Sequence, residues 1–233
     1  MNSFLAMILT LIAAIAWLRA MDFAAQRGLV ESRLSRKLIH IGTGPIFVLC
    51  WLLFPGEWYD RYLAALVPGL ITIQFALIGL GVVKDEASVK AMSRTGDPRE
   101  ILRGPLYYGV MFVLLTILFW KDSPVGMVAL MMMCGGDGVA DIVGSRIRSA
   151  RLPWSPEKSA AGSLSVLIGG FGLSALILMV YIALGIFPAP LASYLLPLAV
   201  IALGSMAVES LPHKDVDNIT MTLTAVLLGW WLF

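Results

Sequence analysis

The segment 134–144 (CGGDGVADIVG) places two carboxylates, Asp137 and Asp141, four residues apart where an apolar run meets a polar loop. On a helix this spacing puts both on one face. Two such unpaired charges about 4 Å apart repel each other by up to ~4 kcal/mol at an effective dielectric constant near 20. Mg²⁺, which typically binds one or two carboxylates with phosphate oxygens and water, would remove that repulsion. The alternative is a helix end with two solvated acids. A functional role is favoured, because an acid at membrane depth costs about 2.5–3.5 kcal/mol.

A lysine follows in the segment 152–163 (LPWSPEKSAAGS). Ser155 followed by Pro156 predicts an N-cap and a first helical residue, which places Lys158 and Ser159 in the first helical turn. A lysine there opposes the helix dipole. A phosphate group, however, would be attracted both by the lysine and by the exposed N–H groups. An interfacial lysine without a ligand is the alternative.

Oxygen ligands recur in the segment 209–218 (ESLPHKDVDN). Glu209 ends a long charge-free stretch, and Asp215, Asp217 and Asn218 are packed into four positions. Such side chains suit a hard cation or a ribose. A polar turn before the last helix is the alternative.

Two basic segments complete the set of candidate residues. In 33–40 (RLSRKLIH), Arg33 is interpreted as a positive-inside anchor, and three side chains on adjacent turns are candidates for contacting a nucleotide: Arg36, Lys37 and His40. In 96–108 (GDPREILRGPLYY), Arg103 is a candidate phosphate contact, and Tyr107 and Tyr108 are placed to lie beside an acyl or prenyl chain. An interfacial anchor with a tyrosine belt is the alternative for this second segment.

The composition shows what kind of element must position these residues. Of the 233 residues, 59% are hydrophobic and 14% are charged, with a net charge of +2. A soluble domain would need more polar surface, so the composition indicates an integral membrane protein. Disorder and a dedicated nucleic-acid-binding function are excluded by the high hydrophobicity and the small, dispersed positive charge. Cys50 and Cys134 lie in apolar runs and form no CxxC motif.

Charge-free stretches predict an all-α, polytopic bundle of about eight transmembrane helices (7–8), forming the single domain 1–233. The stretches are 2–18, 38–54, 62–83, 104–120, 123–136, 159–208 and 219–233. Pro188 and Pro190 should split 159–208 into two helices. The run 123–136 is short, so it either continues as a helix past Asp137 or is partly re-entrant. Residues 1–35 are expected to form the first helix and a basic loop.

The basic residues predict the orientation. Fifteen of the 17 lie in the odd-numbered loops, whereas the even-numbered loops carry Arg61 and Lys121. The positive-inside rule then places both termini outside and the odd loops, with 12 of the 15 carboxylates, on the cytoplasmic (or stromal) face. A charged, water-soluble substrate is therefore expected to bind at that face, while membrane lipids surround the bundle. No protein partner is indicated.

From about residue 36 to the end, the chain resembles phytol kinases and farnesol kinases, within a wider group that includes dolichol kinases and phosphatidate cytidylyltransferase-like enzymes. The motifs that carry this resemblance are 36–40 (RKLIH), 96–109 (GDPREILRGPLYYG), 133–144 (MCGGDGVADIVG), 156–163 (PEKSAAGS), 208–212 (VESLP) and the pair Asp217 and Asn218. Of these, 96–109 points to isoprenoid alcohols.

The resemblance implies phosphate transfer to the hydroxyl of a prenyl alcohol, giving a prenyl monophosphate, with CTP as the usual donor and Mg²⁺ as the cofactor. It implies that Asp137 and Asp141 bind the metal and phosphates, and that Glu209, Asp217 and Asn218 complete the nucleotide or metal site. The phosphate-binding helix start would comprise Lys158, Ser159, Gly162 and Ser163. Asp137, Asp141 and Lys158 form the expected catalytic set, with Asp137 the candidate acceptor of the hydroxyl proton.

Two other functions stay open on the sequence alone. A phosphatidate cytidylyltransferase would also use CTP and Mg²⁺ but would release pyrophosphate instead of CDP. An ion-coupled transporter would use Asp137 and Asp141 as ion sites and would need access from both sides of the membrane. No motif specifies which prenyl alcohol is preferred.

Overall fold

The computed structural model describes residues 1–93, 95–212 and 216–233 and is almost entirely helical. The α-helices are α1 (Ser3–Gln26), α2 (Ser32–Cys50), α3 (Asp60–Gly79), α4 (Glu86–Met92), α5 (Gly104–Leu118), α6 (Pro124–Met131), α7 (Gly138–Arg146), α8 (Ala160–Ala183), α9 (Leu191–Glu209) and α10 (Asp217–Leu232). Shorter elements are the 3₁₀ turns η1 (Trp51–Leu53) and η2 (Pro98–Leu102), the π-helical turn η3 (Met132–Asp137), and a hairpin of β1 (Arg151–Leu152) and β2 (Ser155–Ser159).

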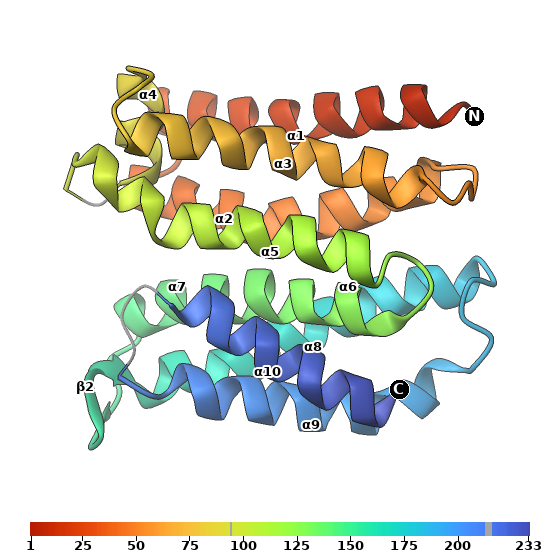
Figure 1. The fold of residues 1–233 in the computed structure, drawn as a ribbon. Helices are drawn as coiled ribbons and strands as arrows, with labels where there is room; N and C mark the ends of the chain where they lie inside the picture. Colours follow the sequence, from red (N-terminus) through yellow and green to blue (C-terminus); the bar gives the residue numbers. More distant parts are fainter. Residues whose placement is uncertain (94, 213–215) are drawn as a thin grey trace.

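Within the part of the chain that the structure describes, seven helical segments are long and apolar enough to cross a membrane. They are Ser3–Gln26, Arg33–Leu53, Asp60–Gly79, Pro98–Leu118, Pro124–Arg146, Ala160–Ala183 and Leu191–Glu209. The last helix, α10, has 16 residues and runs back along the bundle, so both chain termini lie at the end opposite α4 and β2 (Figure 1). The prediction of a polytopic all-α bundle with 7–8 spans is confirmed, and the protein is a multi-pass membrane protein.

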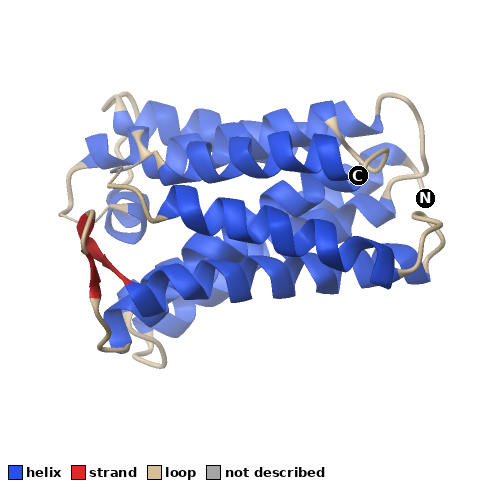
Figure 2. Cartoon of the chain, turned by 90° about the horizontal axis from the view of Figure 1, so that it is seen from below, coloured by secondary structure: helices blue, strands red, loops and turns tan. Residues whose placement is uncertain are grey.

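The bundle has two halves. Helices α1, α2, α3 and α5 form one half, and α6 to α10 form the other, with the helix axes running roughly along one direction (Figures 1 and 2). The segment Pro124–Arg146 is the most deeply buried of the seven spans. It faces the other half of the bundle, where α7 contacts α2 and α6 contacts α5. The main core cluster joins both halves through side chains such as Trp51, Phe112 and Met131.

The short run 123–136 continues as a helix, which decides between the two alternatives left by the sequence. α6, η3 and α7 follow one another without a break from Pro124 to Arg146. The π-helical turn η3 ends at Asp137, and such turns occur frequently at functional sites. Glycine permits close packing here: a Cβ atom on Gly135 would lie 2.7 Å from the backbone oxygen of Gly169 in α8.

The prediction for the start of α8 is wrong. The N-cap is Ser159, whose hydroxyl accepts a hydrogen bond from the N–H of Gly162 at 3.2 Å. Ser155, Pro156 and Lys158 lie on β2, paired with β1. A proline is tolerated there because each strand of a two-stranded hairpin has a free edge. Lys158 therefore precedes the N-cap and does not lie in the first helical turn.

The predicted break after α8 is confirmed. α8 ends at Ala183 and α9 begins at Leu191, with Pro190 as its N-cap residue. Pro190 lacks an N–H and has an extended ψ of 153°, so it ends the connection and starts the new helix.

Candidate functional site

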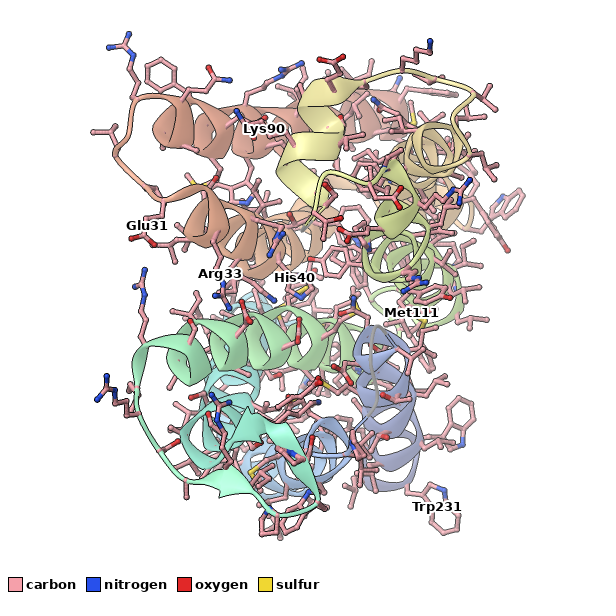
Figure 3. All side chains as sticks on the ribbon, turned by 90° about the vertical axis from the view of Figure 1, so that its left-hand side faces the viewer. Glu31, Arg33, His40, Lys90, Met111 and Trp231 are labelled. Carbon is pink, nitrogen blue, oxygen red and sulfur yellow. The ribbon has the colours of Figure 1, made fainter. Side chains whose placement is uncertain are left out.

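One ionic cluster, here called the α2–α7 cluster, lies between the two halves of the bundle and consists of Arg33, Lys37, His40, Asp137 and Asp141. Lys37 Nζ lies 3.6 Å from Asp137 Oδ2 and 3.7 Å from Asp141 Oδ2. His40 Nε2 lies 3.3 Å from Asp137 Oδ2, and Arg33 donates a hydrogen bond to Asp141 Oδ1 at 3.2 Å. Figure 3 shows Arg33 and His40 on α2 at the boundary between the halves.

These pairs change the argument for a metal ion. Lys37 and Arg33 already offset the repulsion between Asp137 and Asp141, so that repulsion alone does not require Mg²⁺. Sequence reasoning missed the role of Arg33, which pairs with a carboxylate. A signal for this pairing was present in the sequence. Arg33 and Lys37 are four residues apart on one helix, and Asp137 and Asp141 are four residues apart on another, so each pair lies on one face of its helix.

A second group, here called the Lys158 cluster, joins four elements through Lys158 (β2), Ser163 (α8), Glu209 (α9) and Asp217 (α10). Lys158 Nζ lies 3.1 Å from Glu209 Oε1 and 3.5 Å from Asp217 Oδ2, and it also donates a hydrogen bond to the Glu209 carbonyl oxygen. Ser163 Oγ donates to Glu209 Oε2 at 3.2 Å. Glu209 is buried, so its charge depends on these two partners.

The two clusters are electrostatic neighbours. Burial is the main cause that raises the pKa of Asp217; Lys158 lowers this pKa, and the charges of Asp137 and Glu209 raise it further. Four of the residues expected to bind metal and nucleotide, namely Asp137, Lys158, Glu209 and Asp217, therefore lie near one another at the end of the bundle that carries the hairpin (Figure 1). Asp215 lies outside the described residues.

The fit of this region to Mg²⁺ depends on its oxygen atoms. Within residues 1–93, 95–212 and 216–233, no group of three or more His, Cys, Asp or Glu side chains is close enough to hold a metal ion. Mg²⁺ needs fewer, because it typically binds one or two carboxylates together with phosphate oxygens and water. Asp217 Oδ1 and Asn218 Oδ1 are buried and have no hydrogen-bond partner among the described residues. Oxygen atoms of this kind suit a hard cation.

Two tyrosines were expected beside a lipid chain, and Tyr108 lies directly against the α2–α7 cluster. Its hydroxyl donates to the His40 carbonyl oxygen at 2.7 Å and lies 3.1 Å from Cys134 Sγ, and its ring centroid is 4.4 Å from that of His40. Tyr107 is half-buried.

The remaining candidates are placed differently. Arg36 Nη1 donates to the carbonyl oxygen of Ser93 at 3.1 Å, after α4. Arg103 is exposed at the joint between η2 and α5, and Asn218 Nδ2 donates to the carbonyl oxygen of Gly104 next to it at 3.2 Å. Asn218 therefore connects the start of α10 to the segment that contains Arg103.

Gly162 packs against another helix in this structure. A Cβ atom there would lie 3.2 Å from the Ala140 carbonyl oxygen and 3.3 Å from the Cα of Gly144. The small residue lets α8 approach α7 closely. Of the predicted helix-start residues, Lys158 and Ser163 contact Glu209, whereas the Ser159 hydroxyl caps α8.

Comparison with known proteins identifies relatives along most of the chain. It is 44% identical over 222 residues to the "Probable phytol kinase 1, chloroplastic" of Oryza sativa subsp. japonica, covering 94% of this chain and 71% of the relative. It is 37% identical over 222 residues to the "Phytol kinase 1, chloroplastic" of Arabidopsis thaliana, covering 94% and 73%. This chain belongs to the phytol kinase and farnesol kinase family. The "Farnesol kinase, chloroplastic" of Arabidopsis thaliana is 42% identical over 210 residues, covering 89% and 68%.

Membership of this family confirms the resemblance inferred from the motifs. No family model matches the chain, and no solved structure matches it.

Proposed function

We propose that this protein is a prenyl alcohol kinase that transfers the terminal phosphate of CTP to an isoprenoid alcohol and releases a prenyl monophosphate and CDP. The observation that carries the proposal is the convergence of the α2–α7 cluster and the Lys158 cluster at one end of a membrane bundle. The names of the relatives, phytol kinase and farnesol kinase, support the class of acceptor.

The protein supplies charge and position for this reaction. Lys158 would exchange its contacts with Glu209 and Asp217 for the phosphates of the nucleotide. Asp137, Asp217 and Asn218 would hold Mg²⁺, with Asp141 beside them; when bound, the ion supplies positive charge that offsets the charge of the phosphate oxygens. Phosphoryl transfer depends mainly on such positioning and charge neutralisation.

The transfer itself conserves all atoms. The alcohol oxygen forms a bond to the γ-phosphorus, the bond from that phosphorus to the β–γ bridging oxygen breaks, and CDP leaves with the bond's electron pair. The hydroxyl proton passes to Asp137, which lies at the boundary between the halves, 3.3 Å from His40. Arg36, Lys37, His40 and Arg103 remain proposed contacts of the nucleotide.

We assign the site to the cytoplasmic or stromal face, because the loops at this end contain most of the basic residues. Triphosphate would then bind from the aqueous phase, while the alcohol approaches from the bilayer.

One assay tests the function. Purified protein is incubated with Mg²⁺, each γ-labelled nucleoside triphosphate in turn, and phytol, geranylgeraniol, farnesol or phosphatidate. We expect labelled prenyl monophosphate with CTP, and loss of turnover when EDTA removes Mg²⁺. Release of pyrophosphate with formation of CDP-lipid would instead identify a cytidylyltransferase. No lipid product from any donor, together with ion uptake by reconstituted vesicles, would favour a transporter.

A further inference from the structure

An apolar cavity lies between α1, α2, α3 and α5, in the half of the bundle away from the Lys158 cluster. It is lined by uncharged residues from all four helices, among them Thr10, Trp17, Thr43, Ile71 and Phe112. Because none of its lining residues is charged, this cavity suits an apolar part of a substrate.

The polar atoms of the cavity wall are already partnered. The hydroxyl of Thr10 donates to the Ala6 carbonyl oxygen at 2.8 Å, and that of Thr43 donates to the Ile39 carbonyl oxygen at 2.7 Å. The indole N–H of Trp17 also faces the Ile39 carbonyl oxygen, at 3.4 Å. A hydrocarbon can therefore enter without leaving a buried donor unpaired, whereas a polar ligand would find little to bind.

Direct contacts connect this cavity to the α2–α7 cluster. The ring of Phe112, in the cavity wall, lies 4.7 Å from the ring of Tyr108. Tyr108 in turn contacts His40, which lies 3.3 Å from Asp137. A molecule with an apolar chain and one hydroxyl would fit this sequence of contacts, with the chain in the cavity and the hydroxyl near Asp137.

The open space in the cavity is about 30 Å³, room for roughly two water molecules. An isoprenoid chain therefore needs one wall to move. α1 is the wall with the fewest restraints, since it buries Ser3, Ala6 and Thr10 and exposes much of the rest. Its Trp17 packs over Gly42 of α2, where a Cβ atom would lie 2.3 Å from the indole ring.

We infer that the cavity between α1, α2, α3 and α5 holds the isoprenoid chain of the acceptor alcohol and that Trp17 limits how much of the chain fits. This inference rests on the proposed kinase function for the identity of the ligand. It adds where the isoprenoid part of the substrate binds and which residue limits the length of isoprenoid that fits. No sequence motif specifies either.

Matched substitutions on α1 test the assignment. Ala14 lines the cavity and Ala16 is exposed on the same helix. Ala14→Phe should raise the KM for phytol about tenfold, the equivalent of losing roughly two buried methylene groups, without changing the KM for CTP. Prenol, whose chain is short, should be affected much less. Ala16→Phe should leave all three values unchanged. Equal effects of the two substitutions would overturn the assignment.

Trp17→Leu gives the opposite prediction. The smaller side chain should raise kcat/KM for phytol relative to farnesol by a few-fold, because it enlarges the cavity. An unchanged ratio of the two kcat/KM values would contradict the role of Trp17.

Photolabelling separates this inference from the kinase proposal, because it needs no turnover. An isoprenoid alcohol with a diazirine at the end of its chain is photolysed with the full-length protein in detergent, and the adducts are mapped by mass spectrometry. We expect adducts on α1 and α3 that excess phytol prevents and phosphatidylglycerol does not. Adducts confined to α8–α10, or competition by phosphatidylglycerol, would overturn the inference. Cavity adducts with no phosphate transfer from any donor would overturn the kinase proposal alone.

Discussion

Lys158 is the residue on which the ionic balance of its cluster depends. It contacts Glu209 and Asp217, and its side chain is only 17% exposed. Lys158→Met should abolish phosphate transfer and also destabilise the fold by about 3 kcal/mol, because it leaves two carboxylates without their cation. The measurements are turnover with CTP and phytol, and the unfolding temperature in detergent.

A double substitution separates the two effects. Lys158→Met combined with Glu209→Gln removes one of the two unpaired charges, so the unfolding temperature should recover in part while activity stays lost. Full recovery of activity would show that Lys158 acts only on stability.

Asp137 pairs with Lys37 and His40 in the α2–α7 cluster, and its charge also acts on Asp217 of the Lys158 cluster. Asp137→Asn keeps the size of the side chain and removes its charge, so phosphorylation of the alcohol should fall at least about a hundredfold, in the range typical of a lost acid–base or charge-stabilising group. Asp122→Asn is the matched control, because Asp122 pairs with Arg61 at the opposite end of the bundle. The control should retain activity within about twofold. Wild-type turnover by Asp137→Asn would remove Asp137 from the site.

At the scale of single elements, the sequence predicted the helices better than their ends. The proline break before α9 followed directly from backbone chemistry. The start of α8 did not, since Ser155 and Ser159 are both acceptable N-caps by residue type. Pairing of β2 with β1 selects Ser159, and this pairing depends on tertiary structure that a local pattern does not contain.

The glycines of 133–144 show the same limit within the site. Glycine residues near Asp137 leave room for either a ligand or another helix, and in the structure Gly135 and Gly138 pack against Gly169 and Ile41 of neighbouring helices. The residues of the ionic clusters were nearly all predicted, because charged groups in an apolar chain are few. Their pairing was not predicted, since it depends on how α2 rotates against α7.

The crossing of η3 and α8 allows a test of that packing. A Cβ atom on Gly169 would lie 2.5 Å from the Gly135 carbonyl oxygen, whereas one on Gly172 meets nothing within 4 Å. Gly169→Ala should displace η3 and with it Asp137, costing about 1–3 kcal/mol of stability and most of the activity. Gly172→Ala, on the same helix, should leave the unfolding temperature and turnover unchanged. Equal behaviour of the two variants would contradict this crossing.

At the scale of the whole molecule, hydrophobicity and proline positions predicted the membrane bundle, and the basic loops predicted its orientation. The structure places both termini at one end and α4 and the hairpin at the other (Figure 1). The sidedness is a prediction of the positive-inside rule. The division into two halves was not predicted, because every helix is apolar and the pattern does not specify which faces meet.

Cysteine labelling tests the sidedness. Lys90 lies on α4 and Glu57 in the loop at the opposite end, and both are exposed. In a Cys50→Ser background, an impermeant maleimide should label Glu57→Cys in intact cells or organelles and Lys90→Cys only after the membrane is opened, because the loops on the Lys90 side carry 15 of the 17 basic residues. The reverse pattern would place the ionic clusters outside, where a cytoplasmic or stromal triphosphate pool would not reach them, and so would exclude the proposed donor.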